Sequence, residues 1–528
     1  MLKALAVTGV PHIISKSVHL YTPLVLAHLR AMDYLNSPNF PSRIEELIKK
    51  HHVPGLSVAF VEGDRTFSAG YGFATLDPPK PCTPDTLFDI ASSSKSMTAA
   101  AVGLLVRDDE KYPEVKWEAK MSSLLPGDFV MAKQEYTDGI TVDDMCHAKT
   151  SSHDDSYLGL KAAKPDDVRS VTRNLRNLEV TAPLRSKHMY CNIMYAVATY
   201  LIEQKSGLAF ADFLHEHFFK PLEMHSSHLQ PTRAKSFGVG DRIATGYHWD
   251  EKSERYVGFE VWDSPEDQGA GSIITSANDY LKWVKALMNQ EHPIDEEVYK
   301  GLIRMRSFPE PDPEGQMPLT SPEVYAAGLE VFYYRGHMVV GHDGGIPGFG
   351  SKHFFVPSLK FGGVILGNAN NTGEIATALA YELIDEVLCV PGPERLDWDK
   401  VLQERIAKYE NDPKEEELRR VLREDAEAQK MPLSLYTGTY WNLGYKGITV
   451  DVKDEKLFID ASDRSIGFFI VLDHVRKQTE YLGHVSNCLS GEEYDLIPAR
   501  FLFHNDKPVK FGLELEKEAE MIWFNRVE

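Results

Sequence analysis

The stretch FDIASSSKSMTAAAVGLL, residues 88–105, places three consecutive serines and a lysine where an apolar strand gives way to a helical pattern. Serine is favoured at helix N-termini, because its hydroxyl satisfies backbone N–H groups that the first helical turn leaves unpaired. The serine run is therefore explained either as a helix cap or as the site of a reactive hydroxyl.

The spacing of Ser92 and Lys95 is that of a catalytic dyad. Side chains three residues apart on a helix lie on the same face. Burial disfavours the lysine cation, and the neutral amine that results can take the serine proton. Only Ser92 has this partner, since Ser93 and Ser94 have a serine and a methionine at the same spacing. Roughly two such matches are expected by chance in a chain of this length, so the rest of the sequence has to decide between dyad and cap.

Composition limits the class of protein. The chain has 528 residues, 43% of them hydrophobic, which is ordinary for a folded soluble protein with one or two domains. Its formal net charge of -21 repels phosphate backbones and anionic lipids, so we expect neither nucleic acid nor a membrane as partner. No apolar window approaches the length of a membrane span.

Cysteine usage favours a reducing, cytoplasmic location. The five cysteines are scattered and contain no Cys-x-x-Cys pair, so no disulfide framework or metal cluster is predicted; they are Cys82, Cys146, Cys191, Cys389 and Cys488. Pro11 and His12 interrupt the short apolar N-terminal run, and no signal peptide is predicted. We expect no metal and no cofactor.

Strand patterns occur at both ends of the first 390 residues. Residues 41–76 predict a helix followed by two strands, and residues 325–371 return to apolar strands punctuated by glycine. Between them the pattern is mostly helical. This order predicts an α+β domain over residues 41–390, in which both ends share one antiparallel sheet. Residues 1–40 form an N-terminal extension.

The last part of the chain has a different composition. Residues 391–431 are dense in charge and helix formers, which predicts a solvated helical linker. Residues 432–528 alternate apolar and polar positions in short runs, and these predict a small all-β, barrel-like domain.

A second polar pair stands at Tyr190 and Asn192, just before a helical pattern. In an extended segment these side chains point to the same side. A tyrosine hydroxyl near a lysine can relay a proton, and an amide can bind a substrate carbonyl. Taken alone, the pair is better explained as a buried tyrosine and a turn asparagine.

A third motif is His342-Asp343-Gly344-Gly345, after a strand. Its glycines allow the backbone to approach a ligand, and a free N–H there would supply half of an oxyanion hole. A glycine-rich hairpin is the simpler explanation of this motif alone.

The three motifs in this order resemble the serine β-lactamase and penicillin-binding-protein superfamily. Tyr rather than Ser in the second motif, and His rather than Lys in the third, resemble the branch of class C β-lactamases, D-aminopeptidases, family VIII esterases and lovastatin-type acyltransferases. The likeness extends over residues 41–385, including VPGLSVAFVEGDRTFSAGYGFATL and GAGSIITSANDYLKW. It implies a β-lactamase/transpeptidase-like fold, an antiparallel sheet flanked by helices with a helical subdomain. The tail resembles the lipocalin-like domain of some D-aminopeptidase-type members.

The resemblance assigns roles to the motif residues. It implies that Ser92 is the nucleophile, with Lys95 and Tyr190 as the general-base pair. Asn192, His342 and Gly344 would contact the substrate. The backbone N–H groups of Ser92 and Gly345 would form the oxyanion hole.

The loop CHAKTSSHDDSY, residues 146–157, departs from the family pattern, because it lacks a glycine and is shortened. It either forms an acidic rim that favours an amine-bearing substrate or is a solvated polar loop. We expect a small ester, amide or short peptide as substrate, with hydrolysis and acyl transfer both open and the oligomeric state undetermined. The alternative is a catalytically silent ligand-binding protein on the same fold.

Overall fold

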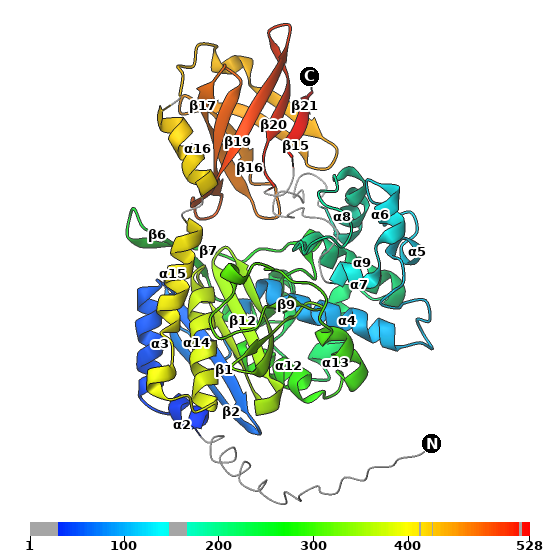
Figure 1. Ribbon diagram of the computed structural model, residues 1–528, viewed down its shortest axis with the longest axis vertical. Coiled ribbons are helices and arrows are strands. Elements are labelled where there is room, and N and C mark those ends of the chain that lie inside the picture. Colours follow the sequence, from blue (N-terminus) through cyan, green and yellow to red (C-terminus); the bar gives the residue numbers. More distant parts are fainter. Residues whose placement is uncertain (1–29, 147–165, 411–412, 425, 517–519, 528) are drawn as a thin grey trace, which may run out of the picture.

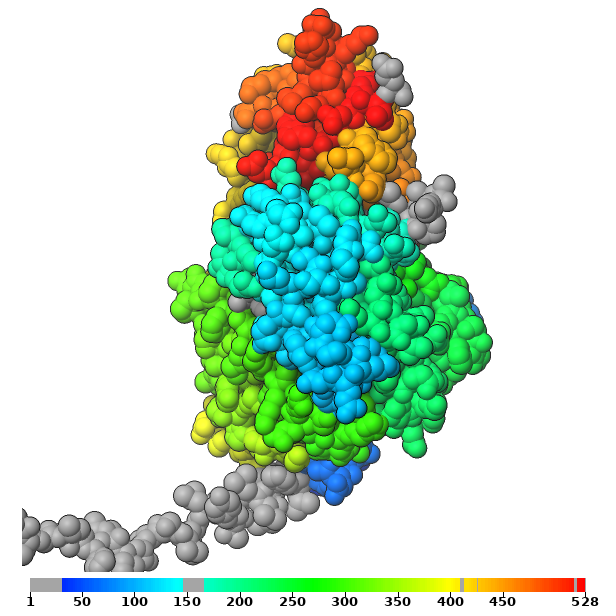
Figure 2. Space-filling view, turned by 90° about the vertical axis from the view of Figure 1, so that its right-hand side faces the viewer, coloured from blue at the N-terminus to red at the C-terminus, as the bar shows by residue number. Residues whose placement is uncertain are grey.

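The structure is a computed structural model that describes residues 30–146, 166–410, 413–424, 426–516 and 520–527. An α+β domain lies below a β-barrel, and helices α15 (Trp398–Glu410) and α16 (Pro413–Glu424) run along one side from the first to the second (Figure 1). Seen from the side, the barrel rests directly on the helical part of the α+β domain (Figure 2).

The α+β domain is built on one eight-stranded antiparallel sheet, in the order β3-β2-β1-β13-β12-β11-β10-β9. Its first three strands come from the N-terminal part of the domain and the other five from the C-terminal part. The two groups meet where β1 pairs with β13, from Leu56 opposite Gly367 to Glu62 opposite Phe361. The predicted shared sheet is confirmed. The strands are β1 (Gly55–Glu62), β2 (Arg65–Leu76), β3 (Pro79–Pro81), β9 (Val324–Tyr325), β10 (Glu330–Tyr334), β11 (His337–Ile346), β12 (Phe349–Val356) and β13 (Phe361–Gly367).

Strand β1 shows why the sheet is covered on both faces. Every residue of β1 is buried. Val58 and Phe60 join one hydrophobic core, whereas Ala59 and Val61 join the other, because successive side chains of a strand point to opposite faces. Helices α3 (Asn39–Lys50) and α14 (Thr372–Val387) cover the first face, and α12 (Ala277–Asn289) covers the second.

A helical subdomain packs beside α12 on the second face (Figure 1). Its centre is α4 (Lys95–Arg107), which is buried from Lys95 to Leu105 and contacts α9 (Asn192–Ser206). The start of the serine run is fixed by a small sheet in which β8 (Ile273–Thr275) pairs with both β4 (Phe88–Asp89) and β5 (His228–Leu229). The remaining helices are α2 (Arg30–Leu35), α5 (Met121–Leu124), α6 (Gln134–Gly139), α7 (Val142–Cys146), α8 (Val168–Asn174), α10 (Phe210–Leu214), α11 (Pro231–Ser236) and α13 (Glu296–Ile303), and β6 (Gly246–Asp250) and β7 (Arg255–Phe259) form a hairpin.

The C-terminal domain is a closed barrel of eight antiparallel strands, which confirms the predicted barrel-like domain. Each strand pairs with the next, and β14 closes the barrel by pairing with β21. Aromatic rings pack together in its buried core, with the ring of Phe501 5.0 Å from that of Tyr436 and 4.5 Å from that of Phe511. The strands are β14 (Gly438–Asn442), β15 (Lys446–Lys453), β16 (Lys456–Ala461), β17 (Phe468–Arg476), β18 (Glu480–Asn487), β19 (Glu493–His504), β20 (Lys507–Leu513) and β21 (Ile522–Arg526).

The structure corrects the expectation of a solvated linker for part of the segment only, since α15 has buried residues and α16 has none. In α15, Trp398 is fully buried and stacks on Tyr381 of α14 at 4.0 Å. Asp399 accepts a hydrogen bond of 2.8 Å from His51, which joins α15 to the C-terminal end of α3. Helix α16 instead packs its leucines and valine on barrel residues Val475, Leu482 and Leu496. Helix α15 therefore belongs to the core of the first domain, whereas α16 packs on the barrel through half-buried side chains.

No helix among the described residues is long and apolar enough to cross a membrane. Cys82, Cys191, Cys389 and Cys488 form no disulfide bond with another described residue. The cytoplasmic location stays a prediction.

Candidate active site

Ser92 lies on a sharp turn between a strand and a helix. The turn is a short 3-10 segment, Ala91–Ser94, between β4 and α4. Ala91 has a left-handed φ of 45°, which is strained for a residue with a Cβ. The carboxylate of Asp89 holds this conformation by accepting the Ala91 N–H at 2.7 Å, and burial raises the pKa of Asp89 to about 7. The turn places Ser92 just before the N-terminus of α4.

The helix-cap interpretation of the serine run is wrong. Ser94 precedes α4 with helical dihedral angles, and its side chain makes no capping hydrogen bond. Its hydroxyl accepts instead from the N–H of Ile273, at 3.3 Å. Ser93 donates to the carbonyl oxygen of His342 at 3.0 Å. The hydroxyls of Ser93 and Ser94 therefore bind other parts of the fold, whereas the Ser92 hydroxyl contacts Lys95.

The predicted dyad is present. Lys95 is completely buried, and its Nζ donates to Ser92 Oγ at 2.9 Å and to the carbonyl oxygen of Ala270 at 2.7 Å. Nζ also lies 4.9 Å from the ring centroid of Tyr190 and 5.2 Å from that of Tyr195. When Lys95 loses its proton, the neutral amine can keep one N–H on the Ala270 carbonyl and turn its lone pair toward Ser92, whose proton it can then accept.

Tyr190 brings the second motif to the dyad. It precedes α9 with a side chain that is 42% exposed, so its ring both covers Lys95 and faces the solvent. Asn192 is the first residue of α9, and its side chain is half-buried. The ring of Tyr190 therefore lies beside Lys95 and open to solvent, and its part in proton relay stays a prediction.

The third motif lies in β11, against the nucleophile turn. Strand β11 stops pairing with β10 at Gly341, and its next carbonyl, from His342, accepts from Ser93. A Cβ added to Gly344 would collide with the Ile90 carbonyl oxygen and the Ser351 hydroxyl, whereas one added to Gly345 meets open space. The close approach supports the predicted oxyanion hole of Ser92 and Gly345 N–H groups, which stays a prediction.

His342 is buried beside the dyad, with both ring nitrogens bonded inside the protein. Nε2 lies 2.9 Å from the hydroxyl of Tyr325, and Nδ1 lies 2.5 Å from the Asp343 carbonyl oxygen. Burial, and then the nearby Lys95, lower the pKa of His342 to about 4. The ring is therefore neutral at pH 7.

Sequence reasoning missed Tyr325 and Ala270. Tyr325 lies in an apolar strand, where a tyrosine is indistinguishable from a core residue. Ala270 acts through its backbone carbonyl, so its side chain gives no signal. Of the unusual loop at residues 146–157, only Cys146 is described, at the end of α7, and the expected acidic rim lies outside the described residues.

Gly344→Ala is expected to destabilise the fold by about 1–3 kcal/mol, because the added methyl group has no space beside the turn. The loss should lower Tm by several degrees in thermal unfolding. Gly345→Ala is the matched control for stability and should leave Tm within about a degree. Equal Tm values for the two variants would contradict the close approach of β11 to the turn.

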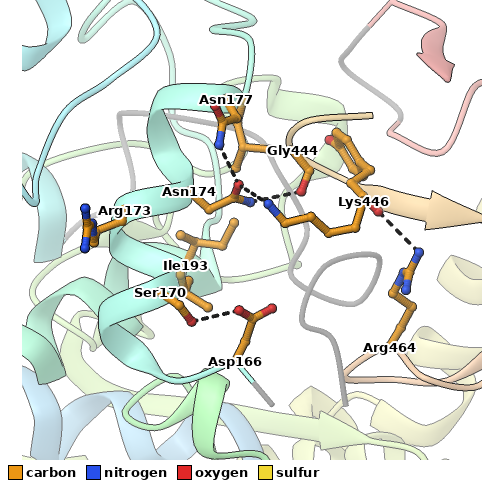
Figure 3. Close-up of a pocket in the computed structure, with 12 residues that line it drawn as sticks. Asp166, Ser170, Arg173, Asn174, Asn177, Ile193, Gly444, Lys446 and Arg464 are labelled. Carbon is orange, nitrogen blue, oxygen red and sulfur yellow. Dashed lines mark hydrogen bonds between the residues drawn. The ribbon is translucent and has the colours of Figure 1, made fainter. Parts of the chain in front are cut away.

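A cavity of about 280 Å³ lies between the helical subdomain and the barrel (Figure 3). Asn174 of α8 donates to the Gly444 carbonyl at 3.0 Å and accepts from Lys446 at 3.2 Å, which ties the two domains together. None of the motif residues lines it. The cavity thus belongs to the domain interface and not to the dyad. Its lining also includes Asp166, Ser170, Val171, Arg173, Asn177, Leu178, Ile193, Tyr445 and Arg464.

The barrel also contacts the segment that holds Lys95. Ser465 donates to the Glu266 carboxylate at 2.7 Å in a buried hydrogen bond, and its carbonyl accepts from Trp262 at 3.1 Å. Four residues after Glu266, the Ala270 carbonyl accepts from Lys95. The barrel therefore contacts the segment 262–270, whose last residue binds Lys95.

The sheet between two helical layers, with a buried Ser-x-x-Lys dyad beside it, defines a β-lactamase/transpeptidase-like serine hydrolase. The beta-lactamase family model matches residues 40–387, and the chain belongs to this family. A second model, a domain of unknown function (DUF3471), matches residues 422–526 and so covers the barrel.

Similar proteins agree with this assignment. The "Unguisins hydrolase ungD'" of Aspergillus campestris is 33% identical over 434 residues, which are 80% of each chain. The octameric penicillin-binding protein homologue from Pyrococcus abyssi has a TM-score of 0.56 at 19% identity, covering 94% of this chain and 100% of its own. A class C beta-lactamase from Rhodobacter sphaeroides has a TM-score of 0.51 at 22% identity, covering 66% and 98%. The two structures share the fold, and the Aspergillus relative is named a hydrolase.

Proposed function

We propose that the protein hydrolyses an ester or amide bond through an acyl-enzyme on Ser92. The observation that carries this proposal is the 2.9 Å hydrogen bond between Lys95 Nζ and Ser92 Oγ, made by a lysine with no exposed surface. A nucleophile within reach of a buried base is the arrangement that acyl transfer requires.

The steps follow from the positions of these groups. Ser92 Oγ attacks the substrate carbonyl carbon while its proton passes to Lys95, with Tyr190 at the open side of the amine. The oxyanion is stabilised by the N–H groups of Ser92 and Gly345. The proton then passes to the leaving alcohol or amine as its bond to carbon breaks. Water repeats the sequence on the acyl-enzyme and releases the acid.

Water is proposed as the acceptor because the relative that matches 80% of the chain is named a hydrolase. Unguisins, the compounds in that name, are the first substrates to test. Incubation should consume the unguisin and give product masses that sum to its mass plus one water, seen by liquid chromatography with mass detection. If unguisins are not turned over but a simple ester is, the proposed reaction stands and a different substrate has to be sought.

Neutral esters and amine-bearing amides are expected to be better substrates than an anionic β-lactam. The third motif offers no cation, because His342 is neutral at pH 7 with both nitrogens engaged. Lys352, the cation nearby, is paired with Asp343 at 2.5 Å. A missing charge-assisted hydrogen bond to the substrate carboxylate corresponds to about a ten- to hundredfold loss.

The measurement is kcat/KM for nitrocefin, a short p-nitrophenyl ester and D-alanine anilide in one buffer. A net charge of -21 also disfavours binding of the anionic nitrocefin. Added salt should therefore reduce the difference in kcat/KM between nitrocefin and the two other substrates. Faster turnover of nitrocefin than of the other two would contradict the preference.

A further inference from the structure

A chain of hydrogen bonds leads from the core to the third motif. The hydroxyl of Tyr195 lies 3.4 Å from that of Tyr325, which lies 2.9 Å from Nε2 of His342. The His342 ring continues the chain through Nδ1 to the carbonyl of Asp343 at 2.5 Å. All three side chains are at most 3% exposed. No part of the mechanism above uses Tyr325.

The direction of each hydrogen bond follows from donor and acceptor chemistry. A backbone carbonyl can only accept, so Nδ1 of His342 carries the proton. The pKa of His342, about 4, makes the ring neutral at pH 7, and Nε2 is therefore an acceptor. Tyr325 must then donate its hydroxyl proton to Nε2, and it is free to accept from Tyr195. One tautomer of His342 satisfies the whole chain.

The last bond of the chain acts on the backbone of the site. Asp343 lies directly before Gly344, the residue that packs against the nucleophile turn. The Nδ1–H of His342 donates to the Asp343 carbonyl and so orients the peptide group between Asp343 and Gly344, one residue before Gly345. Tyr325 also meets the ring of Tyr190 edge-on, at 6.1 Å, a favoured geometry for aromatic pairs.

We propose that Tyr325 is a positioning residue of this active site. By donating to Nε2, its hydroxyl fixes the tautomer of His342, and the His342 ring in turn orients the backbone of β11 at the oxyanion hole. Its ring packs against Tyr190 and so positions that side chain. The inference rests on the proposed function, because it assigns a role in forming the Ser92 acyl-enzyme.

Tyr325→Phe tests the inference, since it removes one hydroxyl and keeps the ring that packs on Tyr190. Without its donor, Nε2 is a buried acceptor with no partner, and the ring can turn or change tautomer. Direct loss of an oxyanion donor costs about a hundred- to thousandfold in rate, so its displacement should cost less. We expect the acylation rate to fall about tenfold, with KM for a p-nitrophenyl ester changed by less than about threefold.

Tyr334→Phe is the matched control. Tyr334 is an equally buried tyrosine of the same sheet, whose hydroxyl donates at 2.7 Å to Asp385 of α14, in the core that contains α3 and α14. It should lower Tm and leave the acylation rate within about twofold. A loss of Tm without a loss of rate in Tyr325→Phe would overturn the inference, because it would make Tyr325 structural like Tyr334.

A double-mutant cycle with His342→Gln gives a second test. If Tyr325 acts mainly through His342, the double variant should acylate as slowly as His342→Gln alone, within about twofold. Full additivity of the two losses would overturn the route through His342. His342→Gln also serves if Tyr325→Phe fails to fold, because wild-type acylation in His342→Gln would overturn the same route.

The readout is the rate of covalent labelling by a fluorophosphonate and by an activated ester, followed by intact mass. It needs no natural substrate. A wild-type protein that is not labelled would contradict the proposed function itself. A labelled wild type with an equally fast Tyr325→Phe would contradict the inference alone.

Discussion

Ser92→Ala is expected to lower kcat/KM for a p-nitrophenyl ester by at least about a thousandfold, because nucleophile and base act as a unit. The variant removes the hydroxyl that Lys95 contacts at 2.9 Å. It should fold normally, since Ser92 lies only partly buried on the turn. The measurement is steady-state turnover together with Tm.

Ser94→Ala is the control for this prediction. It belongs to the same serine run, and its hydroxyl accepts one long hydrogen bond from Ile273. It should retain turnover within a few-fold. Turnover of Ser92→Ala near the wild-type rate, or a loss in Ser94→Ala as large as that expected for Ser92→Ala, would contradict the assignment of the nucleophile.

Lys95→Met is expected to lose turnover to a similar degree, because it keeps the length of the side chain and removes the amine. Lys95 has no exposed surface, and its bond to the Ala270 carbonyl aims Nζ at Ser92. General-base assistance is lost with the lone pair.

Lys95→Arg separates base from charge. Arginine keeps a positive charge but is not deprotonated in proteins. If Lys95 acts as a base, Lys95→Arg should be about as inactive as Lys95→Met in the same ester assay. Substantial turnover in Lys95→Arg would show that the side chain acts through its charge instead.

The sequence predicted features that depend on local spacing. The Ser92–Lys95 pair is three residues apart on one helix, so its contact follows from helix geometry. The strands after the first helix were predictable because their apolar residues and turn signals are contiguous. The barrel followed from the same alternation.

Contacts between distant segments were not predictable. The Ala270 carbonyl that holds Lys95 lies 175 residues away and is a backbone group. Tyr325 reaches His342 only because β9 and β11 lie on either side of β10 in the sheet. Neither relation leaves a local pattern.

The docking of the two linker helices was not predicted, for a related reason. The charge density of the linker hid the apolar residues with which each helix docks, Trp398 in α15 and Leu418, Val421 and Leu422 in α16. The last three lie at i, i+3 and i+4, which is one face of a helix. This spacing of three apolar residues could have predicted the docking of α16. The apolar face is narrow because only one side of the helix packs on the barrel.

The formation of a covalent adduct on Ser92 tests the central claim most directly. The wild-type protein is incubated with a fluorophosphonate, and the intact mass and the labelled peptide are determined beside those of Ser92→Ala and Ser94→Ala. The account predicts one adduct per chain, located on Ser92, present in Ser94→Ala and absent from Ser92→Ala. An unlabelled wild type, or an adduct that persists in Ser92→Ala, would contradict it.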